Sequence, residues 1–356
     1  MHTADLSALG RFPDIPIKKL ICIIAPHEGR GELATSPLVG RDKSDPYNNC
    51  GGSMSSILQP IKKGAAPDFL TIGHVTRDIH PDGSNSPGGT VIFTALTAHR
   101  LGLVAAIVTC ADAQLLAKLP ASLPEIGIAA RTSLATTTFA NSYREGFRTQ
   151  YLRARADQLQ VKDVPKSWCD APLVLLGPLD QELSPELVRF FPRRSGTIIA
   201  ATPQGWLRRW DDDGRVWPTP WTVAEETLSL LDILILSRDD LLPFANGNST
   251  DADTMLTSWS IQVPLLVATD GRYGAILFQH GVAERFPAYP AHEVDPTGAG
   301  DVFAAAFLVH YHRYGDPRKA VDFANCVASL SIEHVGIAGI PTLEMVLERM
   351  ERQKGN

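Results

Sequence analysis

The sequence has few cysteines, no long apolar run and no excess of positive charge, and each shortage argues against a class of protein. The five cysteines, at positions 22, 50, 110, 169 and 326, are scattered and form no Cys-x-x-Cys pair. This argues against a disulfide framework and a cysteine-rich zinc site. A formal net charge of −6 argues against nucleic acid or an anionic membrane as partner. The first apolar run, residues 20–25, is too short for a signal peptide or a membrane span. We therefore expect a soluble, cytoplasmic protein.

The N-terminal segment differs in composition from the rest of the chain. Much of residues 1–66 is rich in Gly, Ser, Pro and Asn, without sustained helical or strand periodicity. We expect residues 1–66 to be a disordered extension, residues 67–345 to form the folded domain and residues 346–356 to be a C-terminal tail. One hypothesis is that translation begins at Met54; the alternative is a genuine flexible extension.

From Asp68 onward, short apolar runs alternate with stretches of helical periodicity. The apolar runs cover residues 68–75, 104–112, 171–179, 196–205, 231–240 and 264–281. This alternation predicts an α/β fold, a doubly wound and mostly parallel sheet with helices on both faces. Ligands in such sheets bind beyond the C-terminal strand ends, where Asp78, residues 237–240, Asp270 and residues 295–301 are expected to lie.

Two segments depart from this alternation. Residues 135–157 are rich in Thr, aromatic residues and Arg around a turn signal, which predicts a β-hairpin. It could be a small β lid over a substrate, with Thr138, Arg148 and Gln150 as contacts, or a surface hairpin without a role. Residues 205–221 hold four of the six tryptophans, which suggests a packed loop or an oligomer interface.

The stretch DPTGAGD, residues 295–301, precedes a strongly apolar helical pattern. Small residues let backbone N–H groups approach an anion, and a helix N-terminus adds partial positive charge. Gly298, Ala299 and Gly300 would then form an anion hole for a phosphoryl group, and Asp301 would act as a general base on a hydroxyl. The alternative is a plain helix start with an acidic first turn.

Several motifs, taken in order, resemble the ribokinase-like (PfkB-type) carbohydrate kinases. DPTGAGDVFAAAFL resembles the C-terminal signature of that family, and the resemblance extends from about residue 68 to about residue 341. It implies Asp301 as catalytic base with Gly298, Ala299 and Gly300, and ATP and Mg²⁺ as cofactors. It also implies substrate contacts from Asp78, Gly88 and Gly89, and nucleotide contacts from Ser237, Thr269, Gly271, Gly274 and Asn325.

Some positions depart from the pattern of the family. Thr90 and Phe93 stand where the family often has asparagine, which puts a ribose-like set of contacts in doubt. Residues 237–240 read SRDD in place of Asn-x-x-Glu. Asp240 could hold a water of hydrated Mg²⁺, and the alternative for Ser237 and Asp240 is a helix cap with an acidic first turn.

The sequence thus predicts an ATP-dependent kinase for a small sugar or polyol. GHVTRD, SIEHVG and the proline in DPTGAGD are most similar to the myo-inositol kinase branch. Nucleoside or other sugar kinases remain open, as does a non-catalytic regulatory protein that binds a nucleotide or sugar. A dinucleotide-dependent oxidoreductase is disfavoured because no GxGxxG follows the first strand. A monovalent cation near Asp295 and a homodimer are further expectations. The histidines show no metal-ligand spacing and are expected to be structural or exposed, with His74 and His80 flanking the substrate loop.

Overall fold

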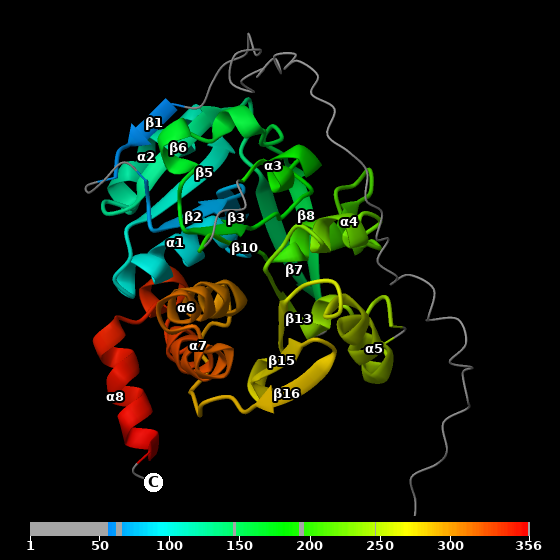
Figure 1. Ribbon diagram of the computed structural model, residues 1–356. Coiled ribbons are helices and arrows are strands. Elements are labelled where there is room, and N and C mark those ends of the chain that lie inside the picture. Colours follow the sequence, from blue (N-terminus) through cyan, green and yellow to red (C-terminus); the bar gives the residue numbers. More distant parts are fainter. Residues whose placement is uncertain (1–55, 62–65, 145–146, 192–195, 246, 355–356) are drawn as a thin grey trace, which may run out of the picture. The chain divides into compact units, whose positions relative to one another are not determined.

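A ten-stranded sheet forms the centre of the computed structural model, which describes residues 56–61, 66–144, 147–191, 196–245 and 247–354 (Figure 1). Seven neighbouring strands run parallel, in the order β6 (Gly127–Thr132), β5 (Ala105–Ala111), β2 (Phe69–Ile72), β9 (Leu173–Leu176), β10 (Ile198–Ala201), β13 (Ile233–Ser237) and β14 (Leu265–Thr269). Antiparallel strands β1 (Ser56–Gln59), β15 (Ala275–Gln279) and β16 (Val282–Phe286) complete its two edges. The predicted α/β fold with a mostly parallel sheet is confirmed.

Helices cover both faces of this sheet, because its strands bury side chains on both sides. In β2, Phe69 joins one hydrophobic cluster and Leu70 the other. Figure 1 shows α6 and α7 side by side, close to α1. The first cluster includes α1 (Thr90–Arg100), α2 (Ala113–Ser122), α6 (Ala299–Tyr314), α7 (Pro317–Ser331) and α8 (Leu343–Lys354). The second includes α3 (Pro185–Phe190), α4 (Ala224–Leu228) and α5 (Ser249–Trp259). Short 3₁₀ turns are η2 (Val161–Asp163), η3 (Lys166–Trp168), η4 (Pro203–Leu207), η5 (Arg238–Asp240), η6 (Gly271–Tyr273) and η7 (Gly336–Gly339).

A separate four-stranded sheet contains the predicted hairpin. Its order is β4 (Asn85–Gly88), β3 (Thr76–Ile79), β7 (Thr138–Arg144) and β8 (Phe147–Ala154), and we call it the small sheet. Strands β7 and β8 pair antiparallel, as expected for residues 135–157. The tryptophan-rich segment forms a second hairpin, β11 (Arg208–Trp210) with β12 (Val216–Pro218). It joins β8 through a bridge between Tyr151 and Arg215 and a 2.7 Å hydrogen bond from Leu152 N to the Gly214 carbonyl.

Local packing is therefore one role of the tryptophan-rich segment. Trp206 stacks on Trp221 with ring centroids 4.9 Å apart, and Trp210 packs beside Phe139 and Leu152. The oligomer interface stays a prediction.

The ends of the folded domain differ from those predicted. Strand β1 lies inside the segment expected to be disordered and pairs with β6, so residues 56–59 belong to the sheet. Residues 1–55 and 62–65 of this segment lie outside the described residues. The predicted tail from residue 346 is wrong up to Lys354, because α8 continues to that residue. Val346 is fully buried, and Leu343 and Met350 pack on the same cluster, which gives α8 an apolar face at helical spacing.

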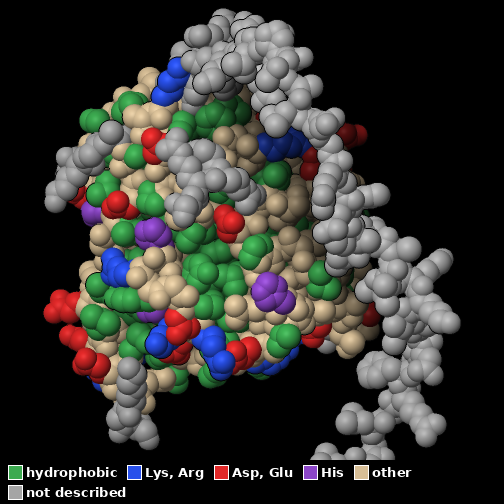
Figure 2. All heavy atoms as spheres, in the orientation of Figure 1, with side chains coloured by type: hydrophobic (Ala, Val, Ile, Leu, Met, Phe, Trp, Pro, Cys, Tyr) green, Lys and Arg blue, Asp and Glu red, His purple; other side chains and the backbone are tan. Residues whose placement is uncertain are grey.

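The surface of the described residues carries charges of both signs. On the face in Figure 2, Lys and Arg side chains are interspersed with Asp and Glu and with apolar groups. Within the described part of the chain, no helix combines the length and hydrophobicity needed to cross a membrane.

Candidate active site

Helix α6 begins at the glycine-rich turn of residues 295–301. Gly298 has φ 77° and ψ 2°, a left-handed conformation that favours glycine. A methyl group at Gly298 would overlap the ring of Phe93, so the turn packs directly on α1. A methyl group at Gly300 would meet no atom within 4 Å. The turn therefore packs on Phe93 at Gly298 and leaves space at Gly300, which suits the approach of an anion. The amide of Ala299 already donates to the Pro296 carbonyl at 3.1 Å, so a ligand would compete for it.

Asp301 lies in the first turn of α6 and hydrogen-bonds the side chain of Thr90 at the start of α1. Burial raises the pKa of Asp301 to about 6. The Thr90 hydrogen bond and the positive charge of Arg208 oppose this rise, and the negative charge of Asp240 adds to it. A carboxyl group with a pKa near neutrality can accept a proton and release it again, as a general base must.

Asp240, in η5 after β13, is the second carboxylate of this region. Burial raises its pKa, while the charge of Arg208 and a hydrogen bond from Gln204 lower it. The hydroxyl of Ser237 accepts from the Asp239 amide at 3.2 Å and so caps η5. Ser237 therefore has the structural role that the sequence left as an alternative.

A pocket of about 180 Å³ borders Asp240 and Arg208. Its walls are partly apolar, from β12 and neighbouring turns, and partly polar. The lining residues are Gln204, Leu207, Arg208, Val216, Trp217, Pro218, Asp239, Asp240 and Pro243. The sequence analysis missed both Arg208 and Gln204. It interpreted the segment of Arg208 only as a tryptophan cluster and the segment of Gln204 only as an apolar run. The two arginines in WLRRW indicated positive charge in this segment, but the sequence did not show which residues they contact.

The predicted acceptor residues lie together at the start of α1, the end that also carries Thr90. A methyl group at Gly88 would overlap the carboxylate of Asp78, so Asp78 lies directly against the backbone of Gly88. Asp78 also accepts a hydrogen bond from the Thr76 hydroxyl at 3.1 Å. Gly89 follows with φ 100° and begins α1. Because Thr90 is the next residue, one helix start connects Asp78 with Asp301.

The contacts predicted from the hairpin lie in β7 and β8 and stay predictions. Thr138 is buried, and its hydroxyl donates to the Thr136 carbonyl at 2.8 Å, so it is already satisfied. Arg148 lies in β8, opposite Tyr143, and its side chain lies outside the described residues. Gln150 is half-buried in β8, opposite Asn141.

The predicted nucleotide-binding residues follow the neighbouring strands. Thr269 ends β14 and is in register with Ser237 of β13, so the two lie side by side. Gly271 and Gly274 shape the turn into β15, with φ 52° and 93°. Asn325, on α7, is 6% exposed and donates from its amide nitrogen to the carbonyls of Phe286 and Pro287, at 3.4 and 3.1 Å. The amide nitrogen of Asn325 therefore stabilises the contact between α7 and the chain at the end of β16 in this conformation.

Asp295 holds the other end of the glycine-rich turn. Its carboxylate accepts from the amides of Thr297 at 3.0 Å and Gly336 at 2.9 Å. Burial alone would raise the pKa of Asp295, but these hydrogen bonds and the nearby His80 lower it. Asp295 therefore orders the turn, in contrast to Asp301.

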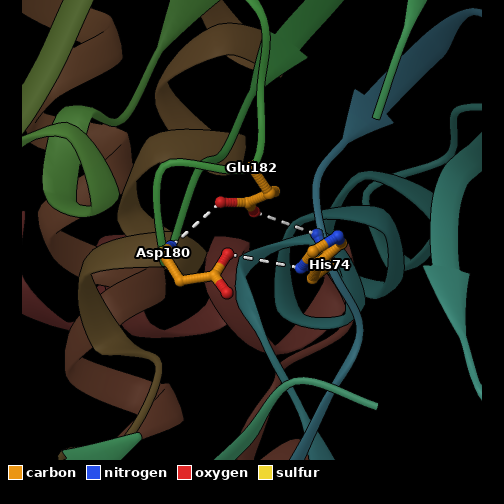
Figure 3. A group of neighbouring side chains, drawn as sticks. All are labelled: His74, Asp180 and Glu182. Atoms are coloured by element: carbon orange, nitrogen blue, oxygen red, sulfur yellow. Dashed lines mark hydrogen bonds and ion pairs between the residues drawn. The ribbon is translucent and has the colours of Figure 1, made fainter. Parts of the chain in front are cut away.

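One histidine belongs to a buried group of charged side chains. His74 lies with Asp180 and Glu182, and the nitrogen and oxygen atoms that they could offer to a metal ion are within 4.8 Å of one another (Figure 3). Its burial agrees with the expected structural role. Residues about a hundred positions apart show no recognisable spacing, so the sequence did not reveal this group.

Comparison with known proteins shows which proteins this chain is similar to. Residues 212–343 match the sequence model described as "pfkB family carbohydrate kinase". The resemblance to the PfkB-type carbohydrate kinases that the sequence predicts is confirmed over this stretch. The chain is 31% identical to Fructokinase-2 of Zea mays over 40% of its own length and 47% of that protein. It is 27% identical to Fructokinase-1 of Oryza sativa subsp. japonica, over 80% of this chain and 94% of the relative. The chain spans about half the length of the first curated relatives that it matches.

Among solved structures, the chain is similar to a pyrophosphate-dependent kinase in the ribokinase family complexed with a pyrophosphate analog and myo-inositol. The TM-score is 0.67 at 24% identity, over 79% of this chain and 99% of the other. The ribokinase-like fold predicted from the sequence is thereby confirmed.

Proposed function

We propose that this protein is a kinase that transfers a phosphoryl group from ATP to a hydroxyl group of a small sugar or polyol. The observation that carries the proposal is the environment of Asp301. Its carboxyl group has a pKa of about 6, lies at the open start of α6 and is bonded to Thr90, next to the acceptor residues. The match of residues 212–343 to the pfkB family carbohydrate kinase model supports the same reaction class.

Asp301 acts on the acceptor. Its carboxylate takes the proton of the attacking hydroxyl, and the Thr90 hydrogen bond orients it for that task. The backbone at Gly298 and Gly300 receives the charge of the transferring group, and Gly300 leaves open space for it. The positive charge of Arg208 lowers the pKa of the base and attracts the donor phosphates.

Asp78 orients the acceptor. A carboxylate only accepts hydrogen bonds, so its ligand must present hydroxyl donors. Asp78 and Gly88 lie against each other, which places this carboxylate beside the start of α1 and on the path toward Thr90 and Asp301. Fructose and myo-inositol are the first acceptors to test, and the sequence motifs favour myo-inositol. The similar kinase structure that was solved with myo-inositol supports testing myo-inositol as an acceptor.

Asp240 and Asp239 fit a hydrated Mg²⁺ at the edge of the pocket, because Mg²⁺ prefers oxygen ligands and retains waters. When bound with a nucleotide, Mg²⁺ neutralises charge on the phosphates. The small sheet, through β7 and β8, would exclude water from the site. ATP is the expected donor, and pyrophosphate is a second donor to test because the solved neighbour depends on it.

The test is product formation with Mg²⁺ and either ATP or pyrophosphate. Acceptors are fructose, ribose, myo-inositol, cytidine and adenosine, and the phosphorylated product is followed by phosphorus NMR and mass spectrometry. We expect one acceptor to respond strongly, and Asp301→Asn to lower kcat about 10²- to 10⁴-fold.

Asp316→Asn is the matched control. Asp316 also lies at a helix start, where it accepts from the amides of Arg318 at 3.0 Å and Lys319 at 3.2 Å, but that helix is α7. It should retain activity. Equal turnover by Asp301→Asn and the wild type would contradict the proposal, and nucleotide binding without any turnover would favour a regulatory protein.

A further inference from the structure

A buried group of charged side chains lies where the small sheet meets the main sheet. His74 follows β2, and Asp180 and Glu182 follow β9, so they come from neighbouring parallel strands (Figure 3). Their exposed fractions are 0%, 1% and 0%. We call these three residues the His74 cluster. Charged groups are rarely buried so completely without a reason, because removing them from water is costly.

The bonding of Glu182 argues against a metal site. Its carboxylate accepts from the amides of Leu179, at 3.1 and 2.9 Å, Asp180, at 2.9 Å, and His74, at 3.1 Å. These bonds use both oxygens. A metal would have to displace them, and the cluster already contains groups that neutralise one another.

The imidazole of His74 connects three parts of the cluster's surroundings. Its Nε2 lies 3.0 Å from the Asp157 carbonyl, which can only accept, so Nε2 carries a proton. Its Nδ1 lies 3.3 Å from Asp180 Oδ1 and 2.8 Å from the Thr137 hydroxyl. Burial alone would lower the pKa of His74, but the hydrogen bond to Asp180 and the charges of Glu182 and Asp180 raise it. Burial alone would raise the pKa of Asp180, but His74 brings it down to about 2.

The His74 cluster holds both strands of the hairpin at their base. Thr137 immediately precedes β7, and its hydroxyl accepts from the Ala156 amide at 3.0 Å, just after β8. Arg155 donates from Nε to Asp180 Oδ2 at 3.1 Å and from Nη2 to the Asp180 carbonyl at 2.7 Å. The start of β7 and the end of β8 are thus bound to the ends of β2 and β9.

The same histidine supports the acceptor residues. A methyl group at Gly89 would lie 2.6 Å from the His74 carbonyl, so the two backbones are in close contact. The next amide, of Val75, donates to the Thr109 hydroxyl at 2.8 Å. Asp78 follows four residues after His74 and contacts Gly88. A shift of His74 therefore moves Asp78 and the small sheet together.

We propose that His74 is a positioning residue for the acceptor: its buried imidazole, held by the Asp157 carbonyl, the Thr137 hydroxyl and Asp180, sets the place of the small sheet and of Asp78 relative to the main sheet. This role rests on the proposed kinase function. The segment around the cluster also borders β11 of the donor side, because Gln181 donates to the Arg208 carbonyl and the Arg155 guanidinium lies 4.1 Å from the Trp210 ring. These contacts come from Gln181 and Arg155, whereas the His74 imidazole binds the base of the hairpin. Loss of the imidazole should therefore weaken acceptor binding more than donor binding.

The experiment uses the full-length protein with His74→Asn and Thr137→Val, which removes one hydroxyl and is nearly isosteric. We expect the KM for the acceptor to rise at least about 10-fold in His74→Asn and less in Thr137→Val. The KM for ATP should stay within about twofold in both. Amide exchange in residues 138–154 should become faster without substrate, while that of β5 should not change. Cys326→Ala, at a fully buried position of α7, is the control for a general loss of stability.

Two results would overturn the proposal. One is a kinetic result in His74→Asn: either the KM values for acceptor and ATP rise equally, or the melting temperature falls while both KM values stay unchanged, as expected for Cys326→Ala. The other is that the wild type binds a stoichiometric metal ion and Asp180→Asn does not. If the wild type phosphorylates no acceptor, the proposed function fails, but amide exchange still decides the positioning role. If His74→Asn does not fold, the KM values and amide exchange of Thr137→Val are compared with those of the wild type instead.

Discussion

The pH dependence of the reaction tests the identity of the base most directly. With a pKa of about 6, Asp301 is about nine-tenths ionised at pH 7 and about one-tenth ionised at pH 5. If ionised Asp301 is the base, kcat/KM should fall about tenfold from pH 7 to pH 5, with half of the loss near pH 6. The other carboxylate of the turn, Asp295, has a lowered pKa and would place the same loss below pH 4.

Two substitutions should move this acid limb in opposite directions. Arg208 lowers the pKa of Asp301 by its positive charge, so Arg208→Gln should shift the limb to higher pH. Asp240 raises the same pKa by its negative charge, so Asp240→Asn should shift the limb to lower pH. Opposite shifts would show that both residues act electrostatically on one base.

The assay is kcat/KM for the acceptor between pH 4.5 and pH 8 in buffers of constant ionic strength, since salt screens these charges. Stability at each pH is checked by recovery of activity after return to pH 7. An acid limb below pH 4, or shifts of the same sign in Arg208→Gln and Asp240→Asn, would refute the assignment of Asp301 as base.

Three further outcomes follow from the same geometry. Gly298→Ala should lose about 2–4 kcal/mol of unfolding free energy, since its φ is positive and a methyl group would overlap Phe93, while Gly300→Ala should keep its stability and lower kcat; denaturant unfolding and kinetics check the pair. Asp301→Asn should unfold at higher denaturant than the wild type at pH 7 but not at pH 4. The raised pKa means that Asp301 favours folding most below pH 3.8 and loses this contribution as pH rises through about 6; partial exposure limits the gain to about 1–2 kcal/mol. Asp78→Asn should raise the acceptor KM about 10- to 100-fold with an unchanged ATP KM, and an equal rise of both would argue against its role as acceptor ligand.

Several features of the fold could be predicted because their signals are local. Buried parallel strands appear as short apolar runs, and β7 and β8 appear as alternating residues around a turn. The start of α6 could be predicted because its turn needs glycine in a left-handed conformation at Gly298 and small residues beside it, and such a run is recognisable in the sequence. Strand β1 and the end of α8 were missed, since one is short and exposed and the other is an amphipathic helix at the chain end.

The sequence by itself determined the α/β class, the family resemblance and the position of Asp301, because each depends on neighbouring residues. Only the tertiary structure decided what surrounds that carboxylate. Thr90 and Phe93, which stand where the family often has asparagine, pack against the turn of α6: Thr90 is hydrogen-bonded to Asp301, and the Phe93 ring lies against Gly298. Arg208 reaches the site from a separate hairpin. These contacts join residues that are far apart in the sequence and come together only on folding. No local pattern of residues can therefore predict them.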